Sequence, residues 1–467
     1  MPSTFYLEKM ANRLHNTDKK QSEVSLLKRN AMERLIAWKE NPHRLPLILK
    51  GARQVGKTWL MKTFGAEHFP QTAYINFDRN ERMRKLFSGD FSIPRILRGL
   101  SVECGMDIIP EETLILFDEI QEVPQAIQAL KYFAEDTAHS YYILAAGSLL
   151  GIALHSGISF PVGKVETLNL YPLTFTEFLE AMGESELLRL LQSQDWELIA
   201  AFREPFAEWL KTYYFVGGMP AAAASYQQAH SFDAVRRIQH QLLNDYEQDF
   251  SKHIPLPLTP RVRMVWNGIP AQLAKENKKF IYSVLKKGAR AREFETAIQW
   301  LADCGLCWRV SRVAKGGFPL KAYEDWGAFK LFLCDVGLLT AMVDLDEKTL
   351  LEGNAVFTEF KGALTEQYVC QQLISELHCT PYYWSAESST GEIDFLIQQD
   401  NAVIPIEVKA AENLRAKSLK TFTENNRLPF GVRISLSNYR QQNALLNLPL
   451  YAISALPAAV RRRNENP

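Results

Sequence analysis

Residues 45–58 read LPLILKGARQVGKT, and this stretch decides the fold. Its first residues form an apolar run typical of a buried strand, and the following WLMKTFG is helical in pattern. Between them, residues 51–58 match the phosphate-binding pattern G-x-x-x-x-G-K-[ST] in the strand, loop, helix order that this loop requires. The flanking elements favour a P-loop over a chance match, so the sequence predicts an α/β nucleotide-binding domain.

The residue types of this loop suit phosphate chemistry. Gly51 and Gly56 let the backbone curve so that successive N–H groups point at phosphate oxygens, at the positive end of the following helix. Lys57 is expected to reach the β- and γ-phosphates of ATP and to act in catalysis, and Thr58 is expected to ligate Mg²⁺. The predicted nucleotide-binding residues of the loop are Gly51, Ala52, Arg53, Gln54, Val55, Gly56, Lys57 and Thr58.

A second strand ends in two acids, since residues 113–119 read TLILFDE. Asp118 is expected to hold Mg²⁺ through water or Thr58, and Glu119 to orient or deprotonate the attacking water. An acidic strand end without a role is the alternative, which the P-loop upstream disfavours.

Two further apolar runs predict strands, TAYINFD at 72–78 and YYILAAGS at 141–148. The second ends at Ser148, which is predicted to face the γ-phosphate as a polar sensor or else to be an ordinary loop residue. Strands that alternate with helices predict a parallel sheet covered on both faces, with nucleotide at its carboxyl edge.

Length and composition limit the remaining possibilities. The chain has 467 residues, which at about 150 per domain gives roughly three domains. Its 53 basic and 53 acidic residues balance, which disfavours a protein that coats nucleic acid non-specifically. A polar amino end, no run long enough to span a bilayer, and six cysteines predict a cytoplasmic protein. Cys304 and Cys307 have metal-like spacing but no further ligand pair nearby, so buried thiols are expected.

Four segments carry a resemblance to a known family: GARQVGKT, LFDEIQEVPQAIQALKYF, AAGSLLGIAL and PVGKVETLNLYPLTFTEFL. Together they resemble prokaryotic AAA+ (STAND-like) P-loop ATPases fused to a carboxyl-terminal domain of unknown function, over nearly the whole chain. The resemblance implies ATP and Mg²⁺ as cofactors and suggests a homo-oligomer. It also implies an arginine finger where this chain has Lys164 after Gly163; Lys164 keeps the charge but not the planar fork, and Arg95 and Arg98 are unranked substitutes.

The middle of the chain is helical in pattern from residue 173 to about 255, as expected of a lid. Within it, Gly217-Gly218-Met219-Pro220 resembles the Gly-x-Pro element of STAND ATPases, which implies that Pro220 lies near the adenine, although the same residues can be a plain turn.

Residues 280–313 predict a helix, a basic turn, a helix and a strand, in the order of a winged helix. The second helix carries one apolar stripe, made of Phe294, Ala297, Ile298, Leu301 and Ala302. The segment either contacts DNA phosphates or serves as an internal scaffold; Glu293 and Glu295 interrupt the positive face and favour the scaffold. The basic residues in question are Lys286, Lys287, Arg290 and Arg292.

Near the carboxyl end, EIDFLIQ (392–398) and VIPIEVKA (403–410) predict two strands joined by a turn. With a helix before them, this set resembles the PD-(D/E)xK fold of restriction-type nucleases, although Ile393 stands where the motif has Pro. The resemblance implies that Glu366, Asp394 and Glu407 hold Mg²⁺ or Mn²⁺ and that Lys409 orients water. The alternative is a half-exposed hairpin with a Glu407–Lys409 salt bridge.

The sequence thus predicts an α/β fold in five parts. These are an amino-terminal extension (1–30), an AAA+ ATPase core with a parallel sheet (31–172), a helical lid (173–255), a winged-helix-like domain (256–345) and a restriction-endonuclease-like α/β domain (346–467). Two hypotheses remain. In one, ATP hydrolysis is coupled to a domain that cleaves or binds nucleic acid, with DNA favoured over RNA. In the other, the chain is an ATP-driven switch that binds DNA or protein without cutting.

Overall fold

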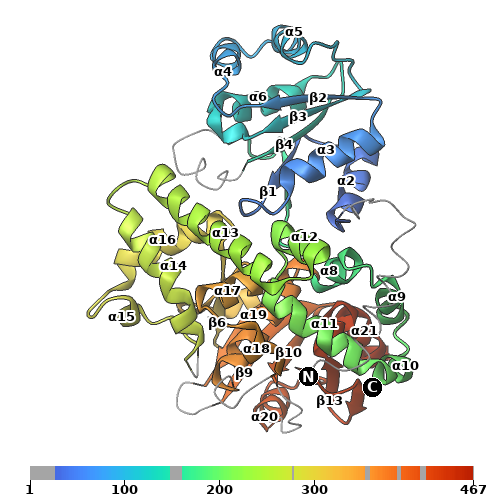
Figure 1. Ribbon diagram of the computed structural model, residues 1–467, viewed down its shortest axis with the longest axis vertical. Coiled ribbons are helices and arrows are strands. Elements are labelled where there is room, and N and C mark those ends of the chain that lie inside the picture. The colour runs from blue at the N-terminus through green and yellow to red at the C-terminus, as the bar shows by residue number, and fades with distance from the viewer. Residues whose placement is uncertain are drawn as a thin grey trace.

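The computed structural model describes residues 27–147, 160–275, 278–352, 358–386, 391–410 and 417–465. A module with a five-stranded sheet lies at one end of the molecule, and helices α8 (Phe175–Ala181), α12 (Pro220–Ala229) and α13 (Phe232–His253) lie between it and a larger mixed part with an eight-stranded sheet (Figure 1). Within the described residues, no helix is long and apolar enough to cross a membrane.

The amino-terminal module alternates strands and helices as predicted. Its elements are α2 (Ala31–Glu40), β1 (Leu47–Lys50), α3 (Lys57–His68), β2 (Gln71–Asn76), α4 (Glu81–Phe87), α5 (Ile93–Cys104), β3 (Thr113–Asp118), η2 (Ile120–Glu122), α6 (Pro124–Glu135), β4 (Tyr142–Ala146) and β5 (Glu166–Asn169). The strand order is β2-β3-β4-β1-β5, and every neighbouring pair is parallel.

Both faces of this sheet are buried, which explains the nearly continuous apolar runs of its strands. Leu49 and Leu116 pack into one hydrophobic core together with α3, whereas Ile48, Ile115 and Phe117 pack into a second core on the other face. The alternation of side chains along each strand divides them between the two cores. The predicted parallel sheet with two covered faces is therefore confirmed.

Helices fill the segment predicted to be a lid. They are α8 (Phe175–Ala181), α9 (Ser185–Ser193), α10 (Trp196–Ala201), α11 (Arg203–Val216), α12 (Pro220–Ala229) and α13 (Phe232–His253). They also pack on the carboxyl-terminal part: Phe206 of α11 stacks on Tyr451 with ring centroids 4.8 Å apart, and Trp196 stacks on Tyr439 at 4.1 Å. This helical layer therefore contacts both ends of the molecule.

The segment predicted to be a winged helix has α14 (Thr259–Leu273), α15 (Tyr282–Leu285), α16 (Ala291–Asp303), β6 (Cys307–Val313), η3 (Leu320–Tyr323) and β7 (Glu324–Leu333). The first expected helix, α15, has only four residues and is followed by a turn with Gly288 at φ 78°. In α16 the predicted stripe is buried except for Ala302, which is half-buried. Strands β6 and β7 are antiparallel but do not form an isolated wing, because β6 continues into the carboxyl-terminal sheet.

The carboxyl-terminal part contains α17 (Val336–Met342), α18 (Glu347–Glu352), α19 (Thr358–Ser375), β8 (Tyr382–Ser385), β9 (Glu392–Gln399), β10 (Ala402–Val408), α20 (Lys417–Asn425), β11 (Gly431–Ser435), β12 (Arg440–Gln442), β13 (Leu445–Pro449), η5 (Leu450–Ala455) and α21 (Leu456–Glu465). The sheet order is β12-β13-β11-β10-β9-β8-β6-β7. The two strands predicted from the sequence are β9 and β10, which pair antiparallel.

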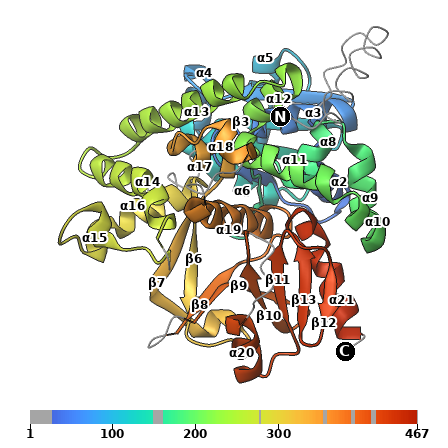
Figure 2. The same ribbon diagram turned by 60° about the horizontal axis from the view of Figure 1, so that its bottom comes forward.

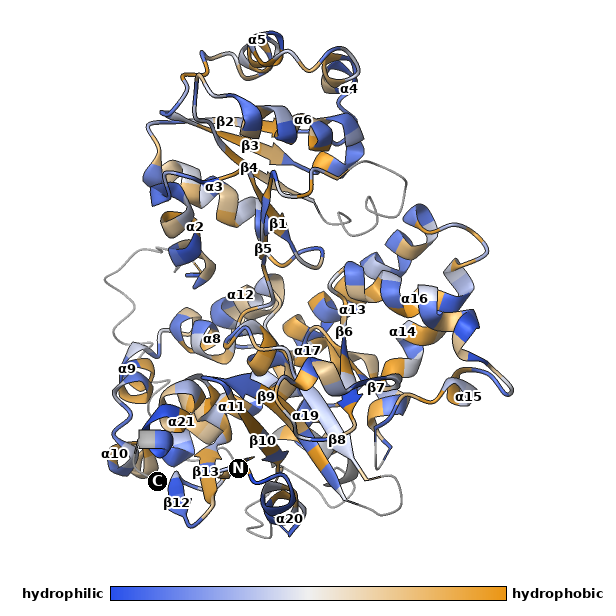
Figure 3. Ribbon diagram, turned by 180° about the vertical axis from the view of Figure 1, so that it is seen from behind, coloured by the Kyte–Doolittle hydropathy of each residue, from blue (hydrophilic) through white to orange (hydrophobic). Residues whose placement is uncertain are grey.

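Helix α19 lies across one face of this sheet (Figure 2). The sheet runs without a break through the predicted boundary between residues 345 and 346, so that boundary does not separate two independent sheets. Apolar residues line strands β3 and β13, whereas α14 and α16 carry polar residues beside their apolar ones (Figure 3).

Candidate functional site

The P-loop connects β1 to α3, as the motif requires. Gly51 adopts φ 148°, and a Cβ on it would lie 2.1 Å from the carbonyl oxygen of Leu170, so no other residue fits there. Gly56 precedes α3 at φ 93°, in the left-handed region that favours glycine. A Cβ on Gly56 would lie 3.7 Å from Pro220 Cγ, which places Pro220 beside the loop.

Lys57 is buried and points back at its own loop. Its Nζ donates to the carbonyl oxygens of Gly51 at 2.9 Å and Ala52 at 2.8 Å. Burial lowers the pKa of Lys57 to about 8, against the opposing influence of Glu119 and Asp118. The ammonium must leave these two carbonyls before it can reach a phosphate.

Thr58 and Asp118 meet at the carboxyl edge of the sheet. Thr58 Oγ1 donates to Asp118 Oδ2 at 2.9 Å, and the Tyr74 hydroxyl donates to the same oxygen at 2.9 Å. Burial and Asp118 together raise the pKa of Tyr74. Hard oxygen donors beside a phosphate-binding loop fit Mg²⁺. The sequence reasoning did not single out Tyr74, although it lies within the predicted strand at 72–78.

Glu119 follows Asp118 in a left-handed conformation, with φ 50°. Gln121 Nε2 donates to Glu119 Oε2 at 2.6 Å. Glu119 therefore lies next to Asp118, at the edge where nucleotide is expected. Ser148, the predicted sensor, lies outside the described residues.

The three finger candidates lie in different places. Lys164 Nζ is 3.0 Å from Glu135 Oε1. Arg95 Nε donates to Asp90 at 2.5 Å and Arg95 Nη2 donates to the carbonyl of Leu86 at 2.9 Å, whereas Arg98 is exposed. The assignment of a finger to any one of the three stays a prediction.

Helix α13 holds the outer part of the P-loop, which the sequence did not indicate. Arg53 forms an ion pair with Asp249, and Gln54 Nε2 donates to Asp245 Oδ2 at 2.9 Å. The Tyr246 hydroxyl donates to the carbonyl of Arg53 at 2.9 Å. Two carboxylates of α13 thus lie beside a loop built to bind phosphates.

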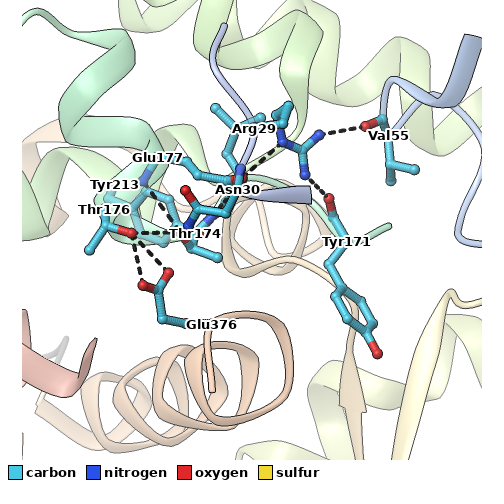
Figure 4. Close-up of polar contacts among 10 residues, drawn as sticks. Arg29, Asn30, Val55, Tyr171, Thr174, Thr176, Glu177, Tyr213 and Glu376 are labelled. Carbon is cyan, nitrogen blue, oxygen red and sulfur yellow. Dashed lines mark hydrogen bonds and ion pairs between the residues drawn. The ribbon is translucent and has the colours of Figure 1, made fainter. Parts of the chain in front are cut away.

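Arg29 holds the inner part of the P-loop (Figure 4). Its guanidinium donates to Val55 O at 2.9 Å, to Tyr171 O at 2.6 Å and to Glu177 Oε1 at 3.1 Å. The Arg29 and Glu177 side chains are 4% and 3% exposed, so this is a buried ion pair. From the sequence, Arg29 is expected only to belong to the amino-terminal extension (1–30), with no role at the P-loop.

The same network reaches the carboxyl-terminal part (Figure 4). Thr176 Oγ1 donates to both carboxylate oxygens of Glu376, at 3.0 and 2.9 Å, and Phe175 N donates to Gln372 Oε1 at 2.9 Å. Gln372 belongs to α19 and Glu376 directly follows it. Burial raises the pKa of Glu376. The amino end of α8 is therefore bonded to the P-loop through Arg29 and to the end of α19.

The Gly217-Gly218 turn is tightly packed against buried Asp335. A Cβ on Gly217 would lie 2.2 Å from Asp335 Oδ1, and Gly218 N donates to Asp335 Oδ2 at 2.6 Å. Gln371 Nε2 of α19 donates to the same carboxylate oxygen at 3.2 Å. A Cβ on Gly218 would lie 2.1 Å from Leu173 O, so neither position leaves room for a side chain, and the contacts of Asp335 join the turn before α12 to α19.

At the predicted carboxyl-terminal site, Asp394 contacts the end of β10, and Lys409 pairs with Glu407. Asp394 Oδ2 accepts a hydrogen bond from Val408 N at 2.7 Å, and Lys409 Nζ lies 2.9 Å from Glu407 Oε1. Burial, with Glu366 as a second cause, raises the pKa of Asp394 to about 7. Glu407 is opposite Arg433 of β11 in the strand register.

The third predicted acid, Glu366, is bound by lysines that no sequence pattern indicated. Glu366 forms an ion pair with Lys278, and its Oε2 lies 3.6 Å from Nζ of the fully buried Lys330. Lys330 Nζ also lies 2.5 Å from Glu392 Oε1. We call Lys278, Lys330, Glu366, Glu392 and Asp394 the lysine–carboxylate cluster.

The predicted metal centre of Glu366, Asp394 and Glu407 does not form in this structure. In the part of the chain that the structure describes, no group of three or more His, Cys, Asp or Glu side chains is arranged to hold a metal ion. The physical reason is charge: lysine ammonium groups occupy the positions around Glu366 that a divalent cation would need. The donor set therefore does not fit the metal in this conformation.

The other residues that the sequence singled out are basic residues exposed on the surface and cysteines buried in the core. Lys286, Lys287, Arg290 and Arg292 are all exposed around the turn before α16. Cys304 and Cys307 are buried free thiols, and burial raises the pKa of both. The turn between them packs against the P-loop, since a Cβ on Gly305 would lie 3.1 Å from Ala52 N.

Comparisons with known sequence families divide the chain into three. Residues 43–179 match the family described as an AAA domain. Residues 207–349 and 361–452 match two domains of unknown function, DUF8612 and DUF4143. No curated protein matches the chain. The amino-terminal module is thus an AAA-type P-loop domain.

Among solved structures, similar chains include the Walker-type ATPase PABY2304 of Pyrococcus abyssi, with 16% identity, a TM-score of 0.43, and coverage of 69% of this chain and 98% of that one. The Orc1 protein of Aeropyrum pernix in complex with DNA has 14% identity, a TM-score of 0.27, and coverage of 69% and 96%. The RuvB Holliday junction branch migration motor of Thermotoga maritima has 15% identity, a TM-score of 0.26, and coverage of 62% and 87%.

Proposed function

We propose that the chain binds ATP with Mg²⁺ at the P-loop and hydrolyses it, and that the bound nucleotide controls the carboxyl-terminal part. The observation that carries this proposal is the 2.9 Å hydrogen bond from Thr58 to Asp118, which joins the P-loop to the acidic end of β3 at the carboxyl edge of a parallel sheet. Nucleotides bind at this edge in open α/β sheets.

Each side chain has a role that its position supports. Thr58 and Asp118 would hold Mg²⁺, which supplies charge neutralisation between the β- and γ-phosphates. Lys57 binds phosphate oxygens once it leaves the carbonyls of Gly51 and Ala52. Glu119 orients the attacking water and accepts its proton. Pro220, beside Gly56, borders the nucleotide.

The contacts of the P-loop with Arg29 and α13 support control of the carboxyl-terminal part by the bound nucleotide. A phosphate that enters the loop brings negative charge toward Asp245 and Asp249, which repel it. The movement of Lys57 also changes a loop that Arg29 and α13 hold in place. Nucleotide binding therefore disturbs the contacts that lead to α8 and to α13.

The test compares Lys57→Ala with wild type by calorimetric titration with ATP and by phosphate release. We expect the variant to lose measurable binding and turnover. Lys85→Ala is the control, because Lys85 is an exposed lysine of the same module, on α4. Undiminished hydrolysis by Lys57→Ala would remove the P-loop from the mechanism.

A second candidate function is cleavage of nucleic acid by the carboxyl-terminal part, in the manner of PD-(D/E)xK nucleases. It is favoured by the meeting of Asp394 with the end of β10, where Glu407 and Lys409 pair. The exposed basic turn at 286–292 supports DNA as the target, because clustered lysine and arginine bind phosphates.

The competing proposal is a switch that binds DNA or protein without cutting, and the lysines on Glu366 favour it in this conformation. Incubation of wild type and Asp394→Ala with DNA or RNA, Mg²⁺ or Mn²⁺, and ATP, ADP or no nucleotide separates the two. Cleavage that Asp394→Ala loses would establish the nuclease. Intact substrates in every condition, with ATP turnover confirmed, would establish the switch.

A further inference from the structure

Trp326 lies exposed at the edge of the large sheet. It belongs to β7, the last strand in the sheet order, so no further strand of the described residues covers it (Figure 2). Trp326 is 74% exposed, against 37% for Trp59, the next most exposed tryptophan among these residues. Single apolar side chains are common on protein surfaces, so the case for a site here comes from how the residue is held and from what lies beside it.

The backbone around Trp326 is a β-bulge. In the antiparallel pairing of β6 with β7, Ser311 is opposite Phe329 and Arg312 is opposite Asp325. Residues 326–328 of β7 therefore have no counterpart on β6. Bulges at sheet edges redirect side chains, and this one leaves the indole in solvent.

Arg309 joins the bulge to the start of α16. Its Nη2 donates to Trp326 O at 2.8 Å, and its Nη1 donates to Glu295 Oε1 at 2.8 Å. Its guanidinium also lies over the Phe329 ring, 4.1 Å from the centroid. The Tyr282 hydroxyl donates to Glu295 Oε2 at 2.9 Å. One arginine thus connects the exposed tryptophan to the elements on both sides of the exposed basic residues.

These basic residues are the four cations between α15 and the first turn of α16, all of them exposed. We call them the basic turn: Lys286, Lys287, Arg290 and Arg292. None of the four forms an ion pair with an acid in the part of the chain that the structure describes.

The two acids beside the basic turn are engaged within the protein, although in the sequence they interrupt its positive face. Glu295 accepts hydrogen bonds from Arg309 and Tyr282, so a cation already compensates its charge. Glu293 Oε1 accepts a hydrogen bond from Arg290 N at 3.3 Å, at the start of its own helix. The basic turn therefore presents positive charge to a ligand.

We propose that Trp326 and the basic turn bind single-stranded nucleic acid, with an unpaired base stacked on the indole and phosphates on the basic turn. Every base has a face that stacks on an aromatic ring, and cationic side chains hold the phosphate backbone beside it. The bases of a duplex are stacked on one another, so an exposed indole favours unpaired strands. The inference rests on the nucleic-acid part of the proposed function but not on cleavage, since it involves binding alone.

The test measures binding of a fluorescein-labelled oligothymidylate of about 20 nucleotides by fluorescence anisotropy, in EDTA so that neither hydrolysis nor cleavage contributes. We expect Trp326→Ala to weaken binding about tenfold, since stacking on one aromatic side chain accounts for roughly that factor. Trp326→Phe keeps an aromatic face and should retain most of the affinity. Phe202→Ala is the matched control, because Phe202 is an exposed aromatic residue at the end of α10.

The dependence of binding on salt tests the basic turn. Lys286→Gln/Lys287→Gln should lower the slope of log affinity against log salt concentration by about 1.4, because each phosphate contact with a single strand contributes about 0.7. Lys85→Gln, at an exposed lysine on α4, should leave the slope unchanged. An unchanged slope in the double variant would remove the basic turn from the proposal.

Three results would overturn the assignment to single strands: equal affinity of wild type and Trp326→Ala, a duplex of the same length that competes as well as the single strand, or no binding by wild type. An oligouridylate of the same length separates RNA from DNA, and preferential binding of either strand over a duplex supports the proposal. Trp326→Ala should keep the melting temperature of wild type, because the side chain is exposed. Undiminished ATP turnover in the same preparations would confine a failure to this surface and leave the P-loop assignment intact.

Discussion

Arg29→Met should make the P-loop open more readily, because it removes a buried guanidinium. That guanidinium donates to Val55 O in the loop, to Tyr171 O and to the carboxylate of Glu177. The substitution keeps an apolar stem of similar length but leaves Glu177 without its cation. It also leaves Val55 O, a carbonyl of the P-loop, without a donor from Arg29.

Loss of one partner of a buried ion pair costs about 3–5 kcal/mol. Glu177 would still accept hydrogen bonds from Asn30 N at 2.7 Å and from Thr174 N at 2.9 Å, so we take the low end of this range, about 3 kcal/mol. The buried carbonyl of Val55 adds about 1 kcal/mol, whereas the part-buried carbonyl of Tyr171 can accept from water instead and adds nothing to the sum. The sum, about 4 kcal/mol, corresponds to a factor of almost a thousand in a local opening equilibrium.

Hydrogen–deuterium exchange followed by mass spectrometry measures this opening directly. We expect amides in peptides 51–60 and 174–182 to exchange several hundredfold faster in Arg29→Met than in wild type. Lys28→Met is the control, since Lys28 is the adjacent cation and its side chain is 75% exposed in its pair with Glu180. We expect no measurable change there.

The double variant Arg29→Met/Glu177→Gln distinguishes an uncompensated charge from lost packing. Because the amide carries no charge, the second substitution should recover roughly 2 kcal/mol of the loss. Unchanged exchange in Arg29→Met, or a double variant that exchanges as fast as the single one, would refute the argument that a buried charge pair holds the loop.

Three further predictions concern single groups. Because the pKa of Lys57 in the free site is lowered to about 8, the ammonium is lost as the pH rises through that value, and ADP affinity measured by calorimetry should fall about tenfold from pH 7 to pH 9; a flat profile in wild type would contradict this. Glu119→Gln should keep ATP affinity but lower kcat at least about a hundredfold in a phosphate-release assay, and an unchanged kcat would exclude Glu119 as the base. Lys330→Met should lower the free energy of unfolding in urea by about 3–5 kcal/mol, whereas Lys420→Met, at the exposed Lys420–Glu424 pair, should leave it unchanged; equal effects would mean that burial of the cluster is unimportant.

The nucleotide-binding edge could be predicted from the sequence because its determinants are local. The glycines of the P-loop and the acids after β3 sit in short segments whose spacing is set by backbone geometry, and a parallel sheet brings such strand ends together. Thr58 and Asp118, 60 residues apart, therefore meet as expected. The strands β9 and β10 were predictable for a similar reason, since alternating residues flank turn residues at 399–401.

The partners of these groups could not be predicted because they come from distant segments without a motif. Arg29 lies 148 residues before Glu177, and Lys278 lies 88 residues before Glu366. A lone Arg or Lys in a sequence is usually solvated, and only the three-dimensional packing shows that these two are buried against acids. The predicted metal ligands show the same limit: among the described residues they are not arranged as a metal site, because the motif around Asp394 and Glu407 gives no information about lysines on other elements.

The position of α19 connects these observations. The last turns of the helix contact α8 through Gln372 and the turn before α12 through Gln371 and Asp335, and Glu366, in its middle, lies in the lysine–carboxylate cluster. Its rigid backbone fixes the spacing of these side chains, so a shift of α8 caused by the P-loop must move Glu366 or strain the polar contacts along the helix. Lys278 reaches the same carboxylate from the α14 side, so relative movement of α14 and α19 would change the Lys278–Glu366 pair first. The control of the carboxyl-terminal part that we propose therefore has a physical route, through two elements that meet at one ion pair.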